Sequence, residues 1–218
     1  MPPRASHSRE GGKEAVEEHL ARLRRCRLCP RMIGPVVLPG GPGIALGRIY
    51  LVGQAPGSRE GAAGRPFAWT AGKTLFRWFE GIGVCEATFR GRAAMAAVCR
   101  CFPGKAPGGG DRVPAREEIE ACAQWMRAEL ALLRPRLILP VGRLAIERFL
   151  GPLPLEDSVG RLHRVRVLGR EVDLIPLPHP SGASTWTKRE PGLSRLAAAL
   201  RLLARHPAWI RLIPRRRK

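Results

Sequence analysis

Six cysteines are the residues whose type and spacing most directly suggest chemistry. Cys26 and Cys29 form a C-x-x-C pair in a predicted loop, where neighbouring arginines favour the thiolate form. Cys101 and Cys122 form a wider pair, one before a Gly/Pro-rich loop and one inside the next predicted helix. Four thiolates suit either zinc or an iron–sulfur cluster. Because a zinc ribbon normally has two close pairs, this spacing favours a cluster that joins distant parts of a larger fold.

Two alternatives to this arrangement stay open. The thiols of a cytosolic chain have little use as structural disulfides, but they can simply be buried and free. Cys99 lies two residues before Cys101 and is a rival for its place as a ligand. Cys85 follows another predicted helix, and we expect it to be a core or surface thiol.

A second set of candidate residues lies in three short segments rich in glycine and proline. They are residues 53–57 (GQAPG), 64–67 (GRPF) and 178–184 (PHPSGAS). Each lies at or just beyond the end of a predicted strand, and such strand ends meet where α/β proteins bind ligands. The first segment contains no acid, histidine or nucleophile, whereas the third contains His179 between two prolines.

The elements that must position these residues alternate between strands and helices. Apolar runs predict strands at 48–52, 93–98 and 136–141, and a hairpin or two edge strands at 164–168 and 171–177. Amphipathic patterns predict helices at 14–25, 70–81, 114–133, 142–150 and 193–205. This alternation predicts a three-layer αβα sandwich with a central, mostly parallel four-stranded sheet. We expect one domain at 14–207, between a disordered tail (1–13) and a basic tail (208–218).

Composition narrows the class of protein further. The chain has 218 residues, enough for one α/β domain, and 44% of them are hydrophobic. It has no long apolar run and its first residues lack the apolar core of a signal peptide, so we expect a monomeric cytoplasmic protein without a membrane partner. The formal net charge of +20 indicates a polyanionic partner such as nucleic acid. Arginine-rich codon usage is the alternative explanation of that charge.

Together these motifs resemble the uracil-DNA glycosylase superfamily. The segment 53–57 is similar to its first motif, 64–67 to its uracil-stacking segment and 179–184 to its second motif. Cys26, Cys29, Cys101 and Cys122 are similar to the four [4Fe-4S] ligands of the bacterial and archaeal members known as families 4 and 5. The resemblance runs from about residue 24 to residue 205. Each motif is short, but four in the right order are specific.

The resemblance implies an enzyme that hydrolyses the N-glycosidic bond of uracil in single- or double-stranded DNA and starts base excision repair. Such an enzyme flips the base into a pocket. Phe67 would then stack on the base, and His179 would donate to the uracil O2 as negative charge develops. The residues implied in uracil binding are Gly53, Gln54, Ala55, Gly57, Phe67 and His179. His179 and Gln54, the latter as a holder of water, are the implied catalytic residues.

The loop after the second motif is implied to bind DNA. Its candidate residues are Ser181, Gly182, Ser184, Trp186, Lys188 and Arg189. Many relatives insert a bulky side chain from this loop into the gap that the flipped base leaves, but this chain has Ala183 there. Trp186, the only large apolar residue of the loop, is the candidate replacement. Packing under the loop is the equally weighted alternative for Trp186.

The chain departs from the family pattern at every place where an acid or a uracil-reading amide is expected. Gln54 and Ala55 replace the acid of the first motif, Thr70 stands at the family 5 acid, and Ala97 replaces the family 4 Asn. We expect a dissociative glycosylase in which water needs little activation. A weakly catalytic or non-catalytic protein that binds uracil or abasic DNA is the alternative. A redox carrier or zinc protein would leave the motifs unexplained, and the nearest spare acids, Glu60 and Asp157, lie outside them.

Overall fold

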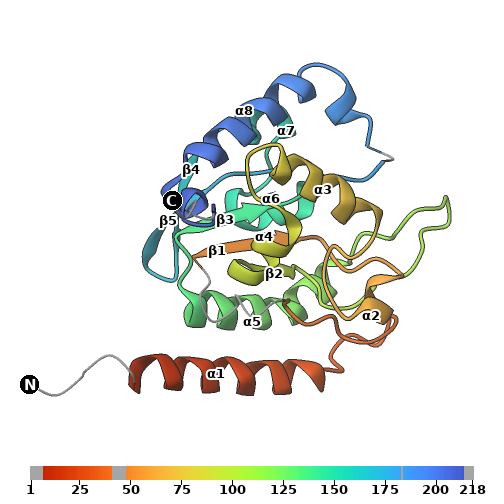
Figure 1. Ribbon diagram of the computed structural model, residues 1–218. Helices are drawn as coiled ribbons and strands as arrows, with labels where there is room; N and C mark the ends of the chain where they lie inside the picture. The colour runs from red at the N-terminus through yellow and green to blue at the C-terminus, as the bar shows by residue number, and fades with distance from the viewer. Residues whose placement is uncertain (1–6, 41–47, 183, 214–218) are drawn as a thin grey trace, which may run out of the picture.

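A five-stranded sheet forms the centre of the molecule, with the strand order β2-β1-β3-β5-β4 (Figure 1). The computed structural model describes residues 7–40, 48–182 and 184–213. The strands are β1 (Ile49–Gly53), β2 (Ala94–Ala97), β3 (Leu137–Pro140), β4 (His163–Val167) and β5 (Arg170–Leu174). The first three strands and β5 run parallel, and β4 pairs antiparallel with β5 at an edge. The predicted mostly parallel sheet is confirmed, but its count of four strands is wrong because both strands of the hairpin join it.

Helices cover both faces of this sheet. The longer ones are α1 (His7–Arg24), α3 (Thr70–Glu80), α5 (Arg116–Leu133), α6 (Arg143–Leu150) and α8 (Gly192–Arg205). The shorter ones are α2 (Glu60–Ala63), α4 (Glu86–Arg92), α7 (Leu155–Ser158), α9 (Pro207–Ile210) and the 3-10 turn η2 (Trp186–Lys188). In Figure 1, α1 and α5 lie on one side of the sheet, and α3 and α8 lie on the other.

The burial of β1 explains this layering. Every residue of the strand is buried, as expected of a parallel strand covered on both faces. Ile49 and Leu51 point into a core shared with α3, α4 and α8, whereas Tyr50 and Val52 point into a core shared with α1 and α5. Alternate side chains of one strand therefore belong to different cores, which is the geometry of an αβα sandwich.

The folded part of the chain extends beyond the predicted domain boundaries at both ends. Helix α1 begins at His7 and not at residue 14, so residues 7–13 are helical and not a disordered tail. At the other end, Trp209 and Leu212 are buried in the core, which extends the domain beyond residue 207 into the predicted basic tail. The rest of both predicted tails, residues 1–6 and 214–218, lies outside the described residues. Within the described part of the chain, every helix is too short or too polar to span a bilayer.

A buried polar network ties α1 to the sheet and to α5. Glu129 on α5 is 1% exposed and accepts a hydrogen bond of 2.8 Å from Nη2 of Arg100. The same carboxylate accepts a bond of 2.5 Å from the Tyr50 hydroxyl and lies 3.1 Å from Nε2 of His19. Although burial raises the pKa of Glu129, the Arg100 charge and these hydrogen bonds leave it below its usual value. The core is therefore organised around a charged carboxylate.

Removing that carboxylate should be strongly destabilising. In Glu129→Ala the Arg100 charge stays buried without its partner, so we expect a loss of about 3–5 kcal/mol in the free energy of unfolding. Glu120→Ala on the same helix is the matched control, because Glu120 pairs with Arg116 in solvent and should contribute less than about 1 kcal/mol. Urea unfolding of both variants measures the difference, and equal midpoints would contradict the role of the network.

Candidate functional site

A pocket of about 390 Å³ lies at the carboxyl edge of the sheet. The segment 53–57 enters it from the end of β1, and Ala96 and Ala97 enter it from β2. Phe67 comes from the loop before α3, and His179 comes from the segment that follows β5. Four segments of the chain thus meet at the edge where parallel strands bring their carboxyl ends together.

Phe67 is held in place from three directions. Its φ of 54° lies in the left-handed region, which a bulky residue rarely adopts. Arg90 on α4 donates hydrogen bonds of 2.9 Å and 2.8 Å to the carbonyls of Pro66 and Phe67. The Phe67 ring lies directly on Gly53, where an added Cβ would come within 2.8 Å of the ring, and its carbonyl lies against Gly72 of α3. The sequence reading missed Arg90, which carries no motif signal.

His179 presents one ring nitrogen to the pocket in a defined state. Nδ1 accepts a hydrogen bond of 3.3 Å from the backbone N–H of Ser181, so the neutral ring carries its proton on Nε2. The ring also packs closely on Gly142, whose φ of 85° suits a residue without a side chain. Although the ring is exposed at the pocket, loss of solvation lowers the pKa of His179 and the Asp111 charge opposes that shift. The neutral donor form is thereby favoured.

The turn after β1 is shaped by the carboxylate of Glu60. Its Oε2 accepts a bond of 3.3 Å from the Gly57 N–H, and its Oε1 accepts one of 3.2 Å from the Ala68 N–H. Burial raises the pKa of Glu60, and these backbone bonds oppose the rise. The Gly57 amide is therefore already bonded to Glu60. The sequence had instead predicted that Gly57 binds uracil. The Gln54 and Ala55 amides are the donors that this turn can offer.

The pocket contains charged and aromatic residues that the sequence reading did not select. Lys105 and Asp111 reach it from the loop before α5, with Nζ and Oδ1 2.6 Å apart. Trp69 is 48% exposed at the pocket, with the Arg59 guanidinium 4.5 Å and the Lys73 ammonium 6.0 Å from its ring centre. Exposed aromatic rings beside cations are typical of nucleic-acid binding. The closeness of Trp69 to two basic residues in the sequence was a signal that could have identified this site.

The predicted DNA-binding loop lies beside the pocket, but its residues differ in position. Ser181 lines the pocket, and the Ser181 carbonyl accepts a bond of 3.2 Å from the Ser184 N–H. Lys188 donates from Nζ to the Gly182 carbonyl at 3.4 Å, and Arg189 is exposed. Trp186 is partly buried against the core, which favours the packing alternative over the wedge. Ala183 lies outside the described residues.

Of the two acids noted from the sequence, Asp157 lies on α7, 3.9 Å from Arg161, and not in the pocket.

A second cavity, of about 710 Å³, collects five of the six cysteines: Cys26, Cys29, Cys99, Cys101 and Cys122. Cys85 is exposed at the start of α4, away from this cavity. Among the described residues, no three metal-binding side chains stand close enough to hold a single ion. A four-iron cluster is wider than one ion, and each of its irons takes a different cysteine, so its ligands stand farther apart.

The five thiols interact electrostatically. Burial raises the pKa of Cys101 to about 11, and the charges of Cys122, Cys26 and Cys29 add to the rise. The interaction with Cys122, together with burial, raises the pKa of Cys99, whereas the pKa of Cys122 is lowered to about 7.

The two cavities share a wall. The Val98 N–H donates to the Gly53 carbonyl at 2.9 Å, and the Cys99 N–H donates to the Gln54 carbonyl at 3.0 Å. The turn of the first cavity is therefore bonded directly to the strand end that carries cysteines of the second.

These features are those of an α/β protein that binds its ligand at the carboxyl edge of the sheet. The chain belongs to the Uracil DNA glycosylase superfamily, whose family model matches residues 44–203. It is 30% identical to the Type-4 uracil-DNA glycosylase of Pyrobaculum aerophilum over 165 residues, which cover 73% of this chain and 79% of that protein. It is 28% identical to the Type-4 enzyme of Archaeoglobus fulgidus, covering 77% and 82% of the two chains. It is 31% identical to the Type-5 uracil-DNA glycosylase of Thermus thermophilus, covering 65% and 75%.

Two helical glycines provide a test of how the pocket is supported. A Cβ at Gly72 would lie 1.9 Å from the Phe67 carbonyl oxygen, whereas a Cβ at Gly91 on α4 would meet nothing within 4 Å. Gly72→Ala should therefore lower the free energy of unfolding by about 1–3 kcal/mol. Gly91→Ala should raise it by about 0.5–1 kcal/mol through helix propensity. Urea unfolding measures both, and a neutral Gly72→Ala would contradict this account of the Phe67 segment.

Proposed function

We propose that this protein is a uracil-DNA glycosylase that hydrolyses the N-glycosidic bond of deoxyuridine in DNA and so starts base excision repair. The observation that carries the proposal is the meeting of the Phe67 ring, the Nε2–H of His179 and the 53–57 backbone in one pocket. Membership of the superfamily and the names of the similar proteins support it. We place its action in the cytoplasm, where thiols stay reduced.

The shape of the pocket suits a flipped base. A glycosylase must extrude its target from the stack, and a volume of about 390 Å³ leaves room for a pyrimidine. Phe67 offers one ring face for stacking, because its φ, Arg90 and Gly53 fix it before a ligand arrives. The Gln54 and Ala55 amides are positioned to donate to the carbonyls of the base.

His179 supplies the stabilisation of the leaving group. As the bond from N1 of uracil to the sugar breaks, negative charge spreads onto the base and its O2. An Nε2–H that is already oriented, because Nδ1 is held by the Ser181 amide, strengthens its hydrogen bond as that charge grows. The neutral ring needs no proton transfer to do this, which suits a dissociative reaction.

Charges around the pocket supply the affinity for DNA. Phosphate contacts fix the strand without reading its sequence, and lysines and arginines with hydroxyl groups are typical donors. Arg59 and Lys73 lie beside the Trp69 ring, and the loop after β5 adds the candidates Ser181, Ser184, Lys188 and Arg189. With a net charge of +20, binding should weaken steeply as salt is added.

The cysteine cavity fits a [4Fe-4S] cluster held by Cys26, Cys29, Cys101 and Cys122. Arg100 lines the same cavity, and its buried Nε and Nη1 have no hydrogen-bond partner within the described chain. Sulfide and thiolate acceptors in the cavity would satisfy such donors, as cluster sulfurs commonly are. When bound, the cluster supplies a cross-link between the loop before the sheet, the end of β2 and α5.

The function is tested with uracil-containing oligonucleotides, cleaving any abasic product with alkali. We expect uracil release by the wild type, and a loss of about 10²–10³-fold in His179→Ala because one donor to the developing charge is gone. His163→Ala is the control, since the His163 ring on β4 bonds to the Ser158 carbonyl and does not line the pocket. No release by the wild type at stoichiometric amounts would instead favour a protein that binds uracil or abasic DNA. An active His179→Ala would overturn the assigned donor.

The ligand set is tested by comparing two neighbouring cysteines. Purified protein should be yellow-brown, with absorbance near about 400 nm and bound iron and sulfide. Cys101→Ser should lose this absorbance, whereas Cys99→Ser should keep it because Cys99 is not one of the four proposed ligands. The reverse pattern would make Cys99 the ligand, and a colourless zinc-loaded protein would refute the cluster.

A further inference from the structure

The pocket lacks a water-activating acid at the positions where the motifs would carry one. Those positions hold Gln54, Thr70 and Ala97. Glu60 does line the pocket, but both of its oxygens accept backbone hydrogen bonds. The carboxylate of Glu60 therefore organises the turn, and each of its oxygens already accepts a backbone N–H.

Asp111 lines the same pocket from a different part of the fold. Its Oδ2 lies 3.4 Å from the position that a Cβ on Gly57 would occupy, so the carboxylate stands against the turn that follows β1. Its charge also acts on His179, raising the pKa of that ring against the effect of desolvation. One carboxylate thus faces both the turn and the ring that line the pocket.

The loop that carries Asp111 is a small hairpin. Lys105 and Asp111 form an antiparallel bridge, and the Arg112 N–H donates to the Gly104 carbonyl at 2.9 Å. Bridge partners place their side chains on one face, which brings the Lys105 ammonium to 2.6 Å from Oδ1 of Asp111. Across the described residues, Oδ2 has no hydrogen-bond partner of its own. Lys105 fixes the carboxylate and leaves Oδ2 for a ligand.

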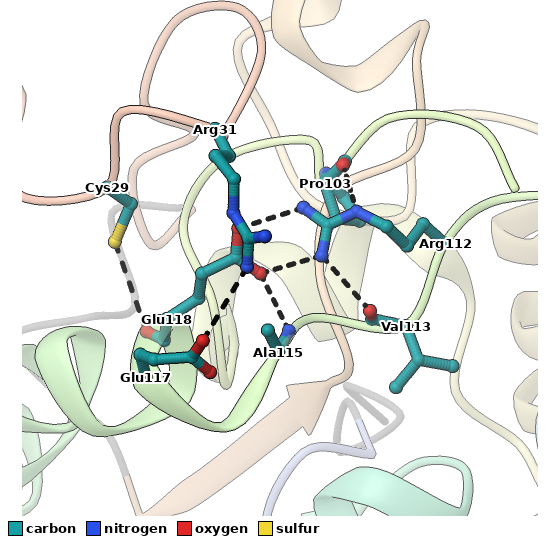
Figure 2. A network of polar contacts seen from close by, with 8 residues as sticks. All are labelled: Cys29, Arg31, Pro103, Arg112, Val113, Ala115, Glu117 and Glu118. Carbon is teal, nitrogen blue, oxygen red and sulfur yellow. Dashed lines mark hydrogen bonds and ion pairs between the residues drawn. The ribbon is translucent and has the colours of Figure 1, made fainter.

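Figure 2 shows how this hairpin is anchored to α5. Arg112 makes two bonds of 2.8 Å to the Glu118 carboxylate and one of 2.8 Å to the Pro103 carbonyl. Glu118 also accepts a bond of 2.6 Å from the Ala115 N–H at the start of the helix. The residue next to Asp111 is therefore held by a bidentate pair, which orients the loop more firmly than a surface pair would.

We propose that Asp111 is the catalytic carboxylate of this glycosylase, holding the attacking water on Oδ2 in place of the missing motif acid. The inference rests on the proposed function. The C1′–N1 bond breaks first, and its electron pair leaves with uracil as an anion facing His179. The water oxygen then bonds to C1′ of the sugar cation. The water proton passes to Oδ2 and then to solvent, while uracil takes a proton from solvent. The negative carboxylate also stabilises positive charge on the sugar.

The test measures single-turnover release of uracil from a single-stranded oligonucleotide. Asp111→Asn keeps the shape of the side chain and removes its charge, so we expect the rate to fall by about 10²–10⁴-fold. Binding of the oligonucleotide should be unchanged or tighter, because a negative charge beside DNA is lost. Asp157→Asn, a carboxylate on α7 outside the pocket, is the matched control and should keep the wild-type rate.

A further measurement separates a chemical role from a structural one. In Asp111→Ala, added sodium formate should restore part of the rate, because a small carboxylate can enter the space left by the side chain. An Asp111→Asn rate close to wild type, or no rescue of Asp111→Ala by formate, would overturn the inference. An inactive wild type would instead overturn the proposed function itself.

Discussion

The pairing of β1 with β2 continues past the ends of both strands, and both cavities depend on it. Beyond the last paired residues, Gly53 and Ala97, the Val98 and Cys99 amides still donate to the carbonyls of residues 53 and 54. The turn that lines the pocket is therefore held by backbone bonds, independent of side-chain identity. The same few residues lead into the cysteine cavity, so a cluster bound there would brace the pocket wall directly.

Close packing of rings against glycines shapes the pocket, and only a few charged side chains line it. Gly53 allows the ring of Phe67 to lie on the strand end, and Gly142 allows His179 to lie on the start of α6. An added Cβ would come within 2.8 Å of the Phe67 ring at Gly53 and within 3.2 Å of the His179 ring at Gly142, so the two glycines let these rings pack closely before a ligand arrives. Carboxylates enter in separate roles, with Glu60 engaged by backbone amides and Asp111 held by Lys105. The carboxylates of Glu60 and Asp111 thus differ in their burial and in the groups that hold them, although their chemistry is the same.

Sequence patterns predicted the strand-end segments and the cysteine pairs because those residues follow local periodicities and spacings. They failed where a long-range contact decides the outcome. Trp209 lies beyond the last predicted helix, but it is fully buried against α3 and α4 aromatics, so the domain ends later than expected. Arg90 has no motif around it, and only the folded chain brings it to the carbonyls of the Phe67 segment. For Trp186 the sequence left both a wedge and a packing role open, and the structure shows it partly buried against the core.

By itself, the sequence determined the class of fold and predicted which segments and cysteines come together at the two cavities. Alternating apolar strands and amphipathic helices allow few arrangements, and parallel strands bring their carboxyl ends together. Only the tertiary structure decided which polar groups stand in the pocket. A loop of glycines and prolines has no periodicity from which to read direction, so nothing in the sequence indicated that Asp111 faces the pocket. The Arg112–Glu118 pair and the Lys105 bridge, formed across the folded loop, turn it toward the pocket.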